Sequence, residues 1–174
     1  MAAQSRRFGE LGVSYYGGIY NTFRIEGVTV DEKRRLSIVA VDFNSDVGPL
    51  QLRGEVAWAP IDVPTPVAEV LGERQWGVHL DAVLPVWHPR IRGLVDPVVS
   101  LGVRLERVDF NRGTFSSTGE NIFDETNAVT ASVSFRPAAG TVFRVNYRRE
   151  SFRDPPGNPS SRTGGFQFGF ATYF

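Results

Sequence analysis

The chain has 174 residues, carries 19 Lys plus Arg against 19 Asp plus Glu, and contains no Cys. This balanced charge produces no overall field that would attract a nucleic acid, so we expect no nucleic-acid partner. The lack of Cys excludes a disulfide framework, a Cys-ligated zinc site and a thiol nucleophile. No run of about 18 or more apolar residues occurs, which excludes a transmembrane helix but not membrane-spanning β-strands, which need only about 9–11 residues.

Eight segments alternate between apolar and polar residues with the period of a β-strand. In chain order they cover residues 10–20, 34–43, 49–58, 75–87, 98–110, 127–135, 141–150 and 163–174. The alternation is poor in 34–43, and the sequence leaves the register of that segment open. The longest helix candidate is the short segment 67–74, within a loop. We therefore predict an all-β, antiparallel up-and-down arrangement of about eight strands in one domain, residues 1–174.

The connections between these segments differ in length in a regular way. Those after the second and sixth segments are short (45–48 and 136–140), and the link 88–97 is intermediate. The other four are long and polar: 21–34, 60–74, 111–126 and 151–162. Short turns at one end and long loops at the other are typical of transmembrane β-barrels. The sequence therefore favours such a barrel, with about eight of its strands in this chain.

The last segment places rings on one side of a strand and small or polar groups on the other. Its aromatic side consists of Phe166, Phe168, Phe170 and Phe174, with Thr172 between the last two. This ending resembles the C-terminal recognition strand of bacterial outer-membrane barrels, which the barrel-assembly machinery reads. Thr172 departs from that pattern, where a larger hydrophobic residue is more common. We expect the four Phe residues to face the membrane and to form the assembly signal.

If the apolar faces point outward, charged and polar residues line the interior. The predicted pore-lining residues are Arg53, Glu55, His79, Asp81, Arg104, Glu106, Arg144, Asn146 and Arg148. Closure by eight strands would pair Arg104 with Glu106 and Arg53 with Glu55 into a plug, whereas sixteen strands would leave a water channel. If the apolar faces instead point inward, the chain is a soluble lipocalin-like barrel.

Several stretches resemble a known family. ELGVSYYGG, GPLQLRGEVAW, VSLGVRLERVDFN followed by TGEN, and SFRPAAGTVFRVNYRRE are similar to the C-terminal half of Gram-negative porins of the phosphate-selective O/P type. The resemblance implies about sixteen strands, a trimer and passive diffusion of small, often anionic solutes. The constriction loop and basic ladder of that family come largely from an N-terminal half that has no match here. The segment MAAQSRRFGEL is not a signal peptide, so we expect processing or a start within a longer gene.

Few residues suggest enzyme chemistry. His79 and His88 are the only histidines, and two histidines without a third ligand nearby predict neither a metal site nor a cofactor. A Ser–His–Asp hydrolase would need an ordered trio, whereas Ser14, Ser100 and Ser132 read as ordinary lumen serines. We therefore predict no catalytic residues and no enzyme activity. The charged stretches 31–35 and 153–162 are expected to be solvated loops, with contact to lipopolysaccharide phosphates as the alternative.

Arg144 and Arg148 lie four residues apart on one face, and two interpretations remain open for them. They form part of a basic strip for anions, or neighbouring Glu residues balance their charge. The main hypothesis is a porin-like channel in the bacterial outer membrane, with the bilayer, lipopolysaccharide and the assembly machinery as partners and a homotrimer as the assembly. The alternatives are a closed, non-conducting eight-stranded barrel with an anchoring role and a soluble ligand-binding barrel.

Overall fold

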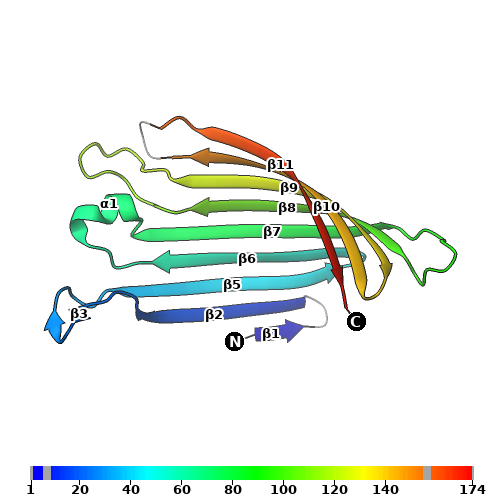
Figure 1. Cartoon of the computed structure of the whole chain (residues 1–174), viewed down its shortest axis with the longest axis horizontal. Coiled ribbons are helices and arrows are strands. Elements are labelled where there is room, and N and C mark those ends of the chain that lie inside the picture. Colours follow the sequence, from blue (N-terminus) through cyan, green and yellow to red (C-terminus); the bar gives the residue numbers. More distant parts are fainter. Residues whose placement is uncertain (1, 6–8, 155–157, 174) are drawn as a thin grey trace.

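The structure is a computed structural model that describes residues 2–5, 9–154 and 158–173. A single large sheet dominates it (Figure 1). Its strands are β1 (Ala2–Ser5), β2 (Gly9–Ile19), β5 (Arg35–Val47), β6 (Leu50–Pro60), β7 (Arg74–Trp87), β8 (Val98–Asp109), β9 (Glu125–Ala138), β10 (Thr141–Arg153) and β11 (Ser161–Thr172). The smaller elements are the hairpin β3 (Arg24–Ile25) and β4 (Val28–Thr29), the 3-10 helix η1 (Thr65–Val67) and the helix α1 (Ala68–Leu71).

The large sheet is antiparallel, and its strands follow one another in chain order from β1 to β11. All eight predicted segments are strands, so the expected up-and-down arrangement is confirmed, and β1 adds a short ninth strand that the sequence did not indicate. In the part of the chain that the structure describes, β1 pairs only with β2 and β11 only with β10. The sheet therefore has two free edges and is not closed. Phe174, the last residue of the predicted assembly signal, lies outside the described residues.

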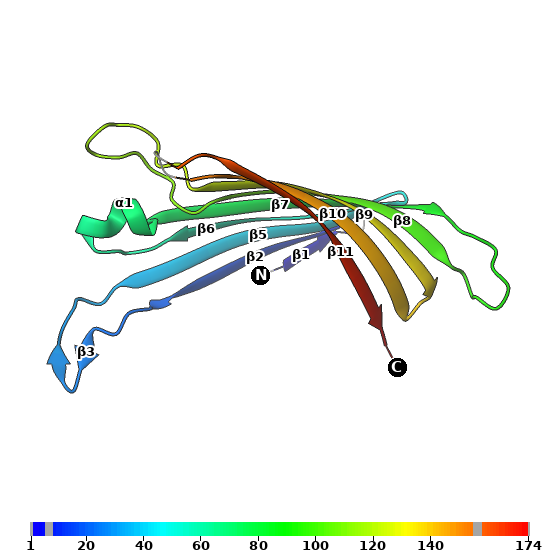
Figure 2. The ribbon, with the colours of Figure 1, turned by 45° about the horizontal axis from the view of Figure 1, so that its top comes forward.

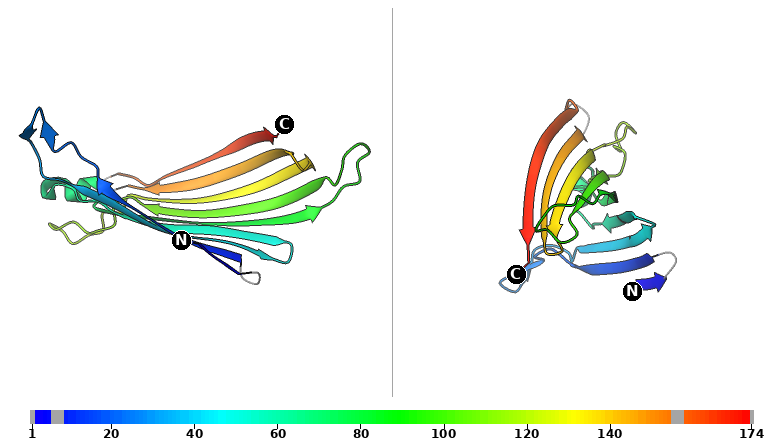
Figure 3. Two further views of the ribbon diagram at one scale, coloured as in Figure 1. Left: turned by 90° about the horizontal axis from the view of Figure 1, so that it is seen from below. Right: turned by 90° about the vertical axis from the view of Figure 1, so that its right-hand side faces the viewer.

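The sheet curves like part of a cylinder wall, which is visible when it is viewed end on (Figure 3). The hairpin β3–β4, helix α1 and the connection between β8 and β9 all lie at one end of the strands (Figure 2). The two-residue turns at 48–49 and 139–140 and the connection 88–97 lie at the other end. Among the described residues, no helix is long and apolar enough to cross a membrane. The predicted division into a long-loop end and a short-turn end is therefore present.

Strand register sorts the side chains onto two faces. Val41 of β5 is in register with Val56 of β6, which in turn is in register with Val78 of β7. This settles the facing of strand β5, which the sequence left open, because Val39, Val41 and Phe43 lie on the same face as the Val, Leu and Trp residues of the next strands. We call this the apolar face. The opposite, polar face carries the charged residues of the same strands.

The apolar face is not covered by other parts of the described chain. Phe168 is 79% exposed, Val103 is 47% exposed and Leu105 is 48% exposed. By contrast, the carboxylate-bearing side chains of Asp81 and Glu106 on the polar face are each only 22% exposed. These two ion-paired acids are thus more sheltered than the apolar residues named above, although Arg53 and Glu55 on the same face are exposed. Residues of β6 to β11 on the polar face line a single hollow, which places that face on the concave side of the curved sheet.

The apolar residues form a band that crosses the strands obliquely. Its middle lies at Val41 on β5 and at Val145 on β10, yet the register leads from Val41 to Ser151 on β10. The band has therefore moved six residues along the strand (from 151 to 145) over five strand-to-strand steps. A residue advances about 3.3 Å along a strand, and neighbouring strands are about 4.8 Å apart. The strands are therefore tilted by about 40° from the direction perpendicular to the long axis of the band.

Most of the buried side chains lie at the long-loop end, and Ala128 of β9, which is 3% exposed, is a buried residue within the sheet. Val63, Asp109, Asn111 and Ile122 are all less than 9% exposed, and they belong to the connections 61–73 and 110–124 or to the end of β8. Asn111 donates from Nδ2 to the backbone oxygen of Glu69 at 2.7 Å, which links the two connections. These loops are therefore ordered partners of each other rather than independent polar segments.

Candidate functional site

All nine residues predicted to line a pore lie on the polar face. Arg53, Asp81 and Arg104 are in register on β6, β7 and β8, and Arg148 of β10 continues this row through Thr130. One row nearer the long-loop end, Glu55, His79 and Glu106 are in register. Asn146 and Arg144 lie nearer the short turns on β10. Period-two alternation places these residues on one face, and the strand register brings them into rows.

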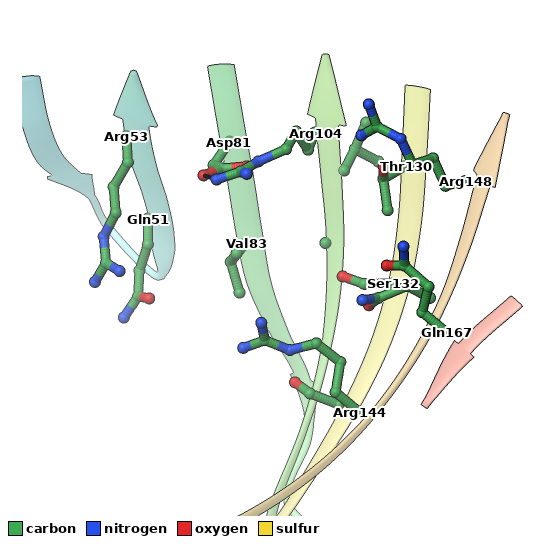
Figure 4. A pocket seen from close by; sticks show the side chains of 14 residues that line it. Gln51, Arg53, Asp81, Val83, Arg104, Thr130, Ser132, Arg144, Arg148 and Gln167 are labelled. Atoms are coloured by element: carbon green, nitrogen blue, oxygen red, sulfur yellow. Dashed lines mark hydrogen bonds and ion pairs between the residues drawn. The ribbon is translucent and has the colours of Figure 1, made fainter. Parts of the chain in front are cut away.

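Asp81 and Arg104 form a bidentate ion pair near the centre of this face (Figure 4). Arg104 Nε and Nη2 donate to the two carboxylate oxygens of Asp81, both at 2.6 Å. Two parallel bonds to a planar guanidinium hold both side chains in fixed orientations. The pair is neutral overall and leaves little charge to act on a solute.

Arg148 makes a larger network that crosses a strand. It bonds to Glu150 on its own strand at 2.8 Å and also to Glu106 on β8, beyond β9. Ala128 lies in register between Glu106 and Glu150, and its small side chain leaves room for the guanidinium to pass. Thr163 of β11 donates to the other oxygen of Glu150 at 3.1 Å. One arginine thus connects β8, β10 and β11.

These contacts differ from the pairs expected for an eight-stranded plug. Arg104 contacts Asp81 rather than Glu106, and Arg53 donates to Asn44 Oδ1 at 3.3 Å rather than to Glu55. Both observed partners are directly in register on a neighbouring strand. Side chains in register are about 5 Å apart at Cβ, closer than residues two apart on one strand, which explains the preference.

Other charges on the polar face have no oppositely charged partner. Within the described ranges, Arg53 and Arg144 form no ion pair, and neither do Glu10, Asp42, Asp46 and Glu55. Of the two interpretations of the arginines on β10, balance by neighbouring glutamates is confirmed for Arg148 alone, and a role in binding anions stays a prediction. Arg148 is balanced by glutamates, while Arg144 is unpaired. The unpaired acids gather on β2, β5 and β6, so this face is not a uniformly basic surface.

The polar face contains a hollow of about 410 Å³. Besides the arginines and Asp81, it is lined by hydroxyl and amide groups, namely Gln51, Thr130, Ser132, Ser134, Asn146 and Gln167 (Figure 4). The Asn146 side-chain oxygen is buried and accepts no hydrogen bond from the described residues. Val83 and Val103 also line it, but polar groups predominate, and such a lining suits water and small polar solutes.

The residues considered for catalysis do not assemble into a reactive set. His79 is in register with Glu55 and Glu106, whereas Ser132 is in register with Gly102 and Asn146. His88 lies in the connection 88–97, away from the polar face. Over the described ranges, no group of three His, Cys, Asp or Glu side chains could hold a metal ion.

The described Phe residues of the last strand lie on the apolar face. Phe166 stacks at a tilt on Tyr147 and Phe170 on Phe143, with ring centroids 5.0 Å apart in each pair. Phe168 lies between them in register with Val145. The two ring pairs lie at the two ends of the row of apolar residues on β10. Trp58 on β6 and Trp76 on β7 lie opposite each other near the long-loop end. Rings at both edges of an apolar band are typical of membrane interfaces.

Comparisons with protein-family models, with curated proteins and with solved structures gave no match to this chain. Functional conclusions therefore rest on the residues and geometry described above.

Proposed function

We propose that this protein forms part of a porin-like β-barrel in the bacterial outer membrane, through which small polar solutes diffuse. The main support is that large apolar side chains lie exposed on one face of the sheet while ion pairs lie sheltered on the other. Phe168 is 79% exposed on the convex face, whereas Asp81 and Glu106 are 22% exposed on the concave one. Lipid around the convex face would remove this apolar surface from water, and a water-filled lumen would solvate the charges.

The oblique apolar band supports the same proposal. The tilt of about 40° that the register implies falls in the range of about 35–45° for transmembrane barrel strands. The outward residues of β7 run from Trp76 to Leu84. At about 3.3 Å per residue and this tilt they cover roughly 20 Å, and the side chains at each end bring the height close to the apolar band of about 25 Å.

The free edges support a barrel with more strands than the eight long ones. Unpaired backbone N–H and C=O groups at a sheet edge are not tolerated in hydrocarbon. In the proposed barrel, further strands therefore pair with β11 and with the β1–β2 edge. A barrel of about sixteen strands encloses an aqueous channel, whereas one of eight is filled by its own side chains.

Two other functions receive less support. A closed eight-stranded anchor would require β11 to pair with β2, and the described residues form no such pairing. A soluble lipocalin-like barrel would require an inward apolar pocket, whereas the concave hollow is lined by Arg, Asp, Ser, Thr and amide groups. Selectivity for anions is not part of the proposal, because acids and arginines without partners both lie on the polar face.

The test is folding and conductance of the protein after refolding from urea. We expect β-structure by circular dichroism only when detergent or lipid is present, and discrete current steps in planar bilayers. Monodisperse folded protein in plain buffer would exclude both membrane functions. Folding into lipid without current steps would exclude the channel and favour the anchor.

A further inference from the structure

A second hollow lies on the convex face, at the long-loop end and outside the proposed channel. It measures about 590 Å³, and the residues that matter here are Trp58, Pro60, Trp76, Arg74 and Arg112. Trp58 and Trp76 are in register on β6 and β7, and Pro60 and Arg74 form the pair nearest the loops. No Asp or Glu lines this hollow. We call it the headgroup groove.

The loops that carry Arg112 are held in place by hydrogen bonds. Arg112 N donates to Arg74 O at 2.8 Å, which brings the two arginines together. Ser116 N donates to Glu69 Oε1 at 2.8 Å, so the loop after β8 is also joined to α1. Gly72 has a φ of +69°, and a Cβ there would lie 2.1 Å from Phe110 O, so this close approach requires glycine. These contacts therefore fix the shape of the groove within the fold.

The groove carries two positive charges that no described residue neutralises. Neither Arg74 nor Arg112 forms an ion pair with the described residues. The neighbouring Arg107 is different, because Glu125 bonds it at 3.1 Å. Two free guanidinium groups favour a ligand with a planar or tetrahedral anion, which arginine binds through paired N–H donors.

The apolar band continues directly below the groove. Val56 and Val78 follow Trp58 and Trp76 on the same face, so a ligand with an anion at one end would lay its remaining length on exposed apolar side chains. Tryptophan at the edge of an apolar band marks the level of lipid headgroups. A free phosphate ion would use the arginines but not the tryptophans or the valines. The combination thus fits an amphiphile better than a soluble anion.

We propose that the headgroup groove binds the phosphorylated headgroup of a lipid in the outer leaflet, the lipid A part of lipopolysaccharide. Arg74 and Arg112 hold a phosphate, Trp58 and Trp76 contact the sugar and the start of the acyl chains, and the chains lie along the apolar face. This inference rests on the proposed membrane function, since it places the long-loop end at the outer surface. It assigns the contact to a defined groove rather than to the charged loop stretches 31–35 and 153–162.

Titration of the detergent-solubilised protein with diphosphorylated lipid A, followed by native mass spectrometry and Trp fluorescence, tests the proposal. The variant Arg74→Gln/Arg112→Gln is compared with Arg149→Gln/Arg162→Gln. The control removes the same charge from the apolar-face side of β10 and β11, where neither arginine has an ion pair with a described residue. We expect the groove variant to bind lipid A about tenfold or more weakly and the control to bind it nearly as well as the wild type.

Two further ligands separate a lipid site from a free-phosphate site. Dephosphorylated lipid A should bind the wild type as weakly as the groove variant binds lipid A, and millimolar inorganic phosphate should not compete. Equal losses in both variants, or effective competition by inorganic phosphate, would overturn the inference. Insertion and conductance are measured on the same preparations. A wild type that inserts without arginine-dependent lipid A binding overturns only this inference, whereas failure to insert overturns the proposed function.

Discussion

Asp81 on β7 and Arg104 on β8 lie opposite each other in register and share two hydrogen bonds of 2.6 Å. This pair neutralises two charges at the centre of the polar face, beside a hollow that also contains the unpaired Arg144. In the proposed channel, the local charge that a solute meets would therefore depend on whether the pair is intact.

Replacing Asp81 by Asn should release the charge of Arg104 toward the lumen. We expect a shift of the reversal potential in a salt gradient toward chloride permeability, because one negative charge is lost in a hollow that four arginines line. Since the Arg104 side chain is 42% exposed, the free energy of unfolding should fall by only about 1 kcal/mol. Asp96→Asn, which removes the same charge in the connection 88–97, should leave the reversal potential unchanged. An unaltered potential in Asp81→Asn would show that this face does not line the conduction path.

Which face of the sheet meets the lipid can be tested by introducing an arginine on each face in turn and comparing the loss of stability. Val103 faces out and Ser132 faces in, on neighbouring strands and one row apart. Val103→Arg should destabilise the lipid-embedded protein by about 2–4 kcal/mol, the cost of an arginine at the bilayer midplane. Ser132→Arg points into the polar hollow and should cost far less. Unfolding by denaturant in lipid vesicles measures both, and equal losses would contradict the assigned facing.

The strands were predictable because their signal is local. Alternation with period two identified all eight long strands and placed the nine polar residues on a common face. β1 was missed because Ala2–Ser5 carries no alternating apolar pattern, and its pairing comes from the neighbouring β2. The hairpin β3–β4 was also missed, although Glu26 and Gly27, with φ of 49° and 87°, form the two-residue turn that joins it.

Contacts between strands were not predictable, because they depend on register and on residues far apart in the chain. Arg148 reaches Glu106 across β9 only because Ala128 lies between them, and no spacing within one segment indicates this. The oblique course of the apolar band likewise requires the register of six strands at once. The link between Asn111 and Glu69 joins two loops that the sequence presents simply as polar connections.

Acid should loosen the loop that carries Asp31. The Arg34 guanidinium, at 3.1 Å, and the backbone N–H of Glu32 hold the pKa of Asp31 below its usual 3.8. The charged carboxylate is thus favoured in the folded loop. Its contribution is complete above about pH 3.8 and is lost as the pH falls through the lowered pKa.

Amide hydrogen exchange in residues 20–34, corrected for intrinsic rates, measures this change. Exchange should accelerate below about pH 3.8 in the wild type. Asp31→Asn should show fast exchange at every pH, because the amide cannot replace the charge-assisted bonds to Arg34. Asp46→Asn, in β5 near the opposite, short-turn end, is the matched control. A pH response that persists in Asp31→Asn would assign the effect to another group.

Asp124, just before β9, should respond to pH in the opposite direction. Burial raises its pKa, and the nearby Asp154 and Asp109 raise it further. The folded loop therefore favours the protonated carboxyl, so its stability is greatest at low pH and decreases as the pH rises through the raised pKa. Asp124→Asn imitates the protonated form and also tolerates the φ of 52° at this position.

The backbone oxygen of Asp124 accepts a hydrogen bond from Phe110 N at 3.0 Å, so exchange of that amide reports on the loop. At pH 7 it should be slower in Asp124→Asn than in the wild type, and the two should converge as the pH falls. Asp154→Asn removes one of the neighbouring charges and should give an intermediate rate. Faster exchange in Asp124→Asn would mean that the carboxylate stabilises the loop in its charged form, because only a favourable partner for the negative charge could make its removal costly.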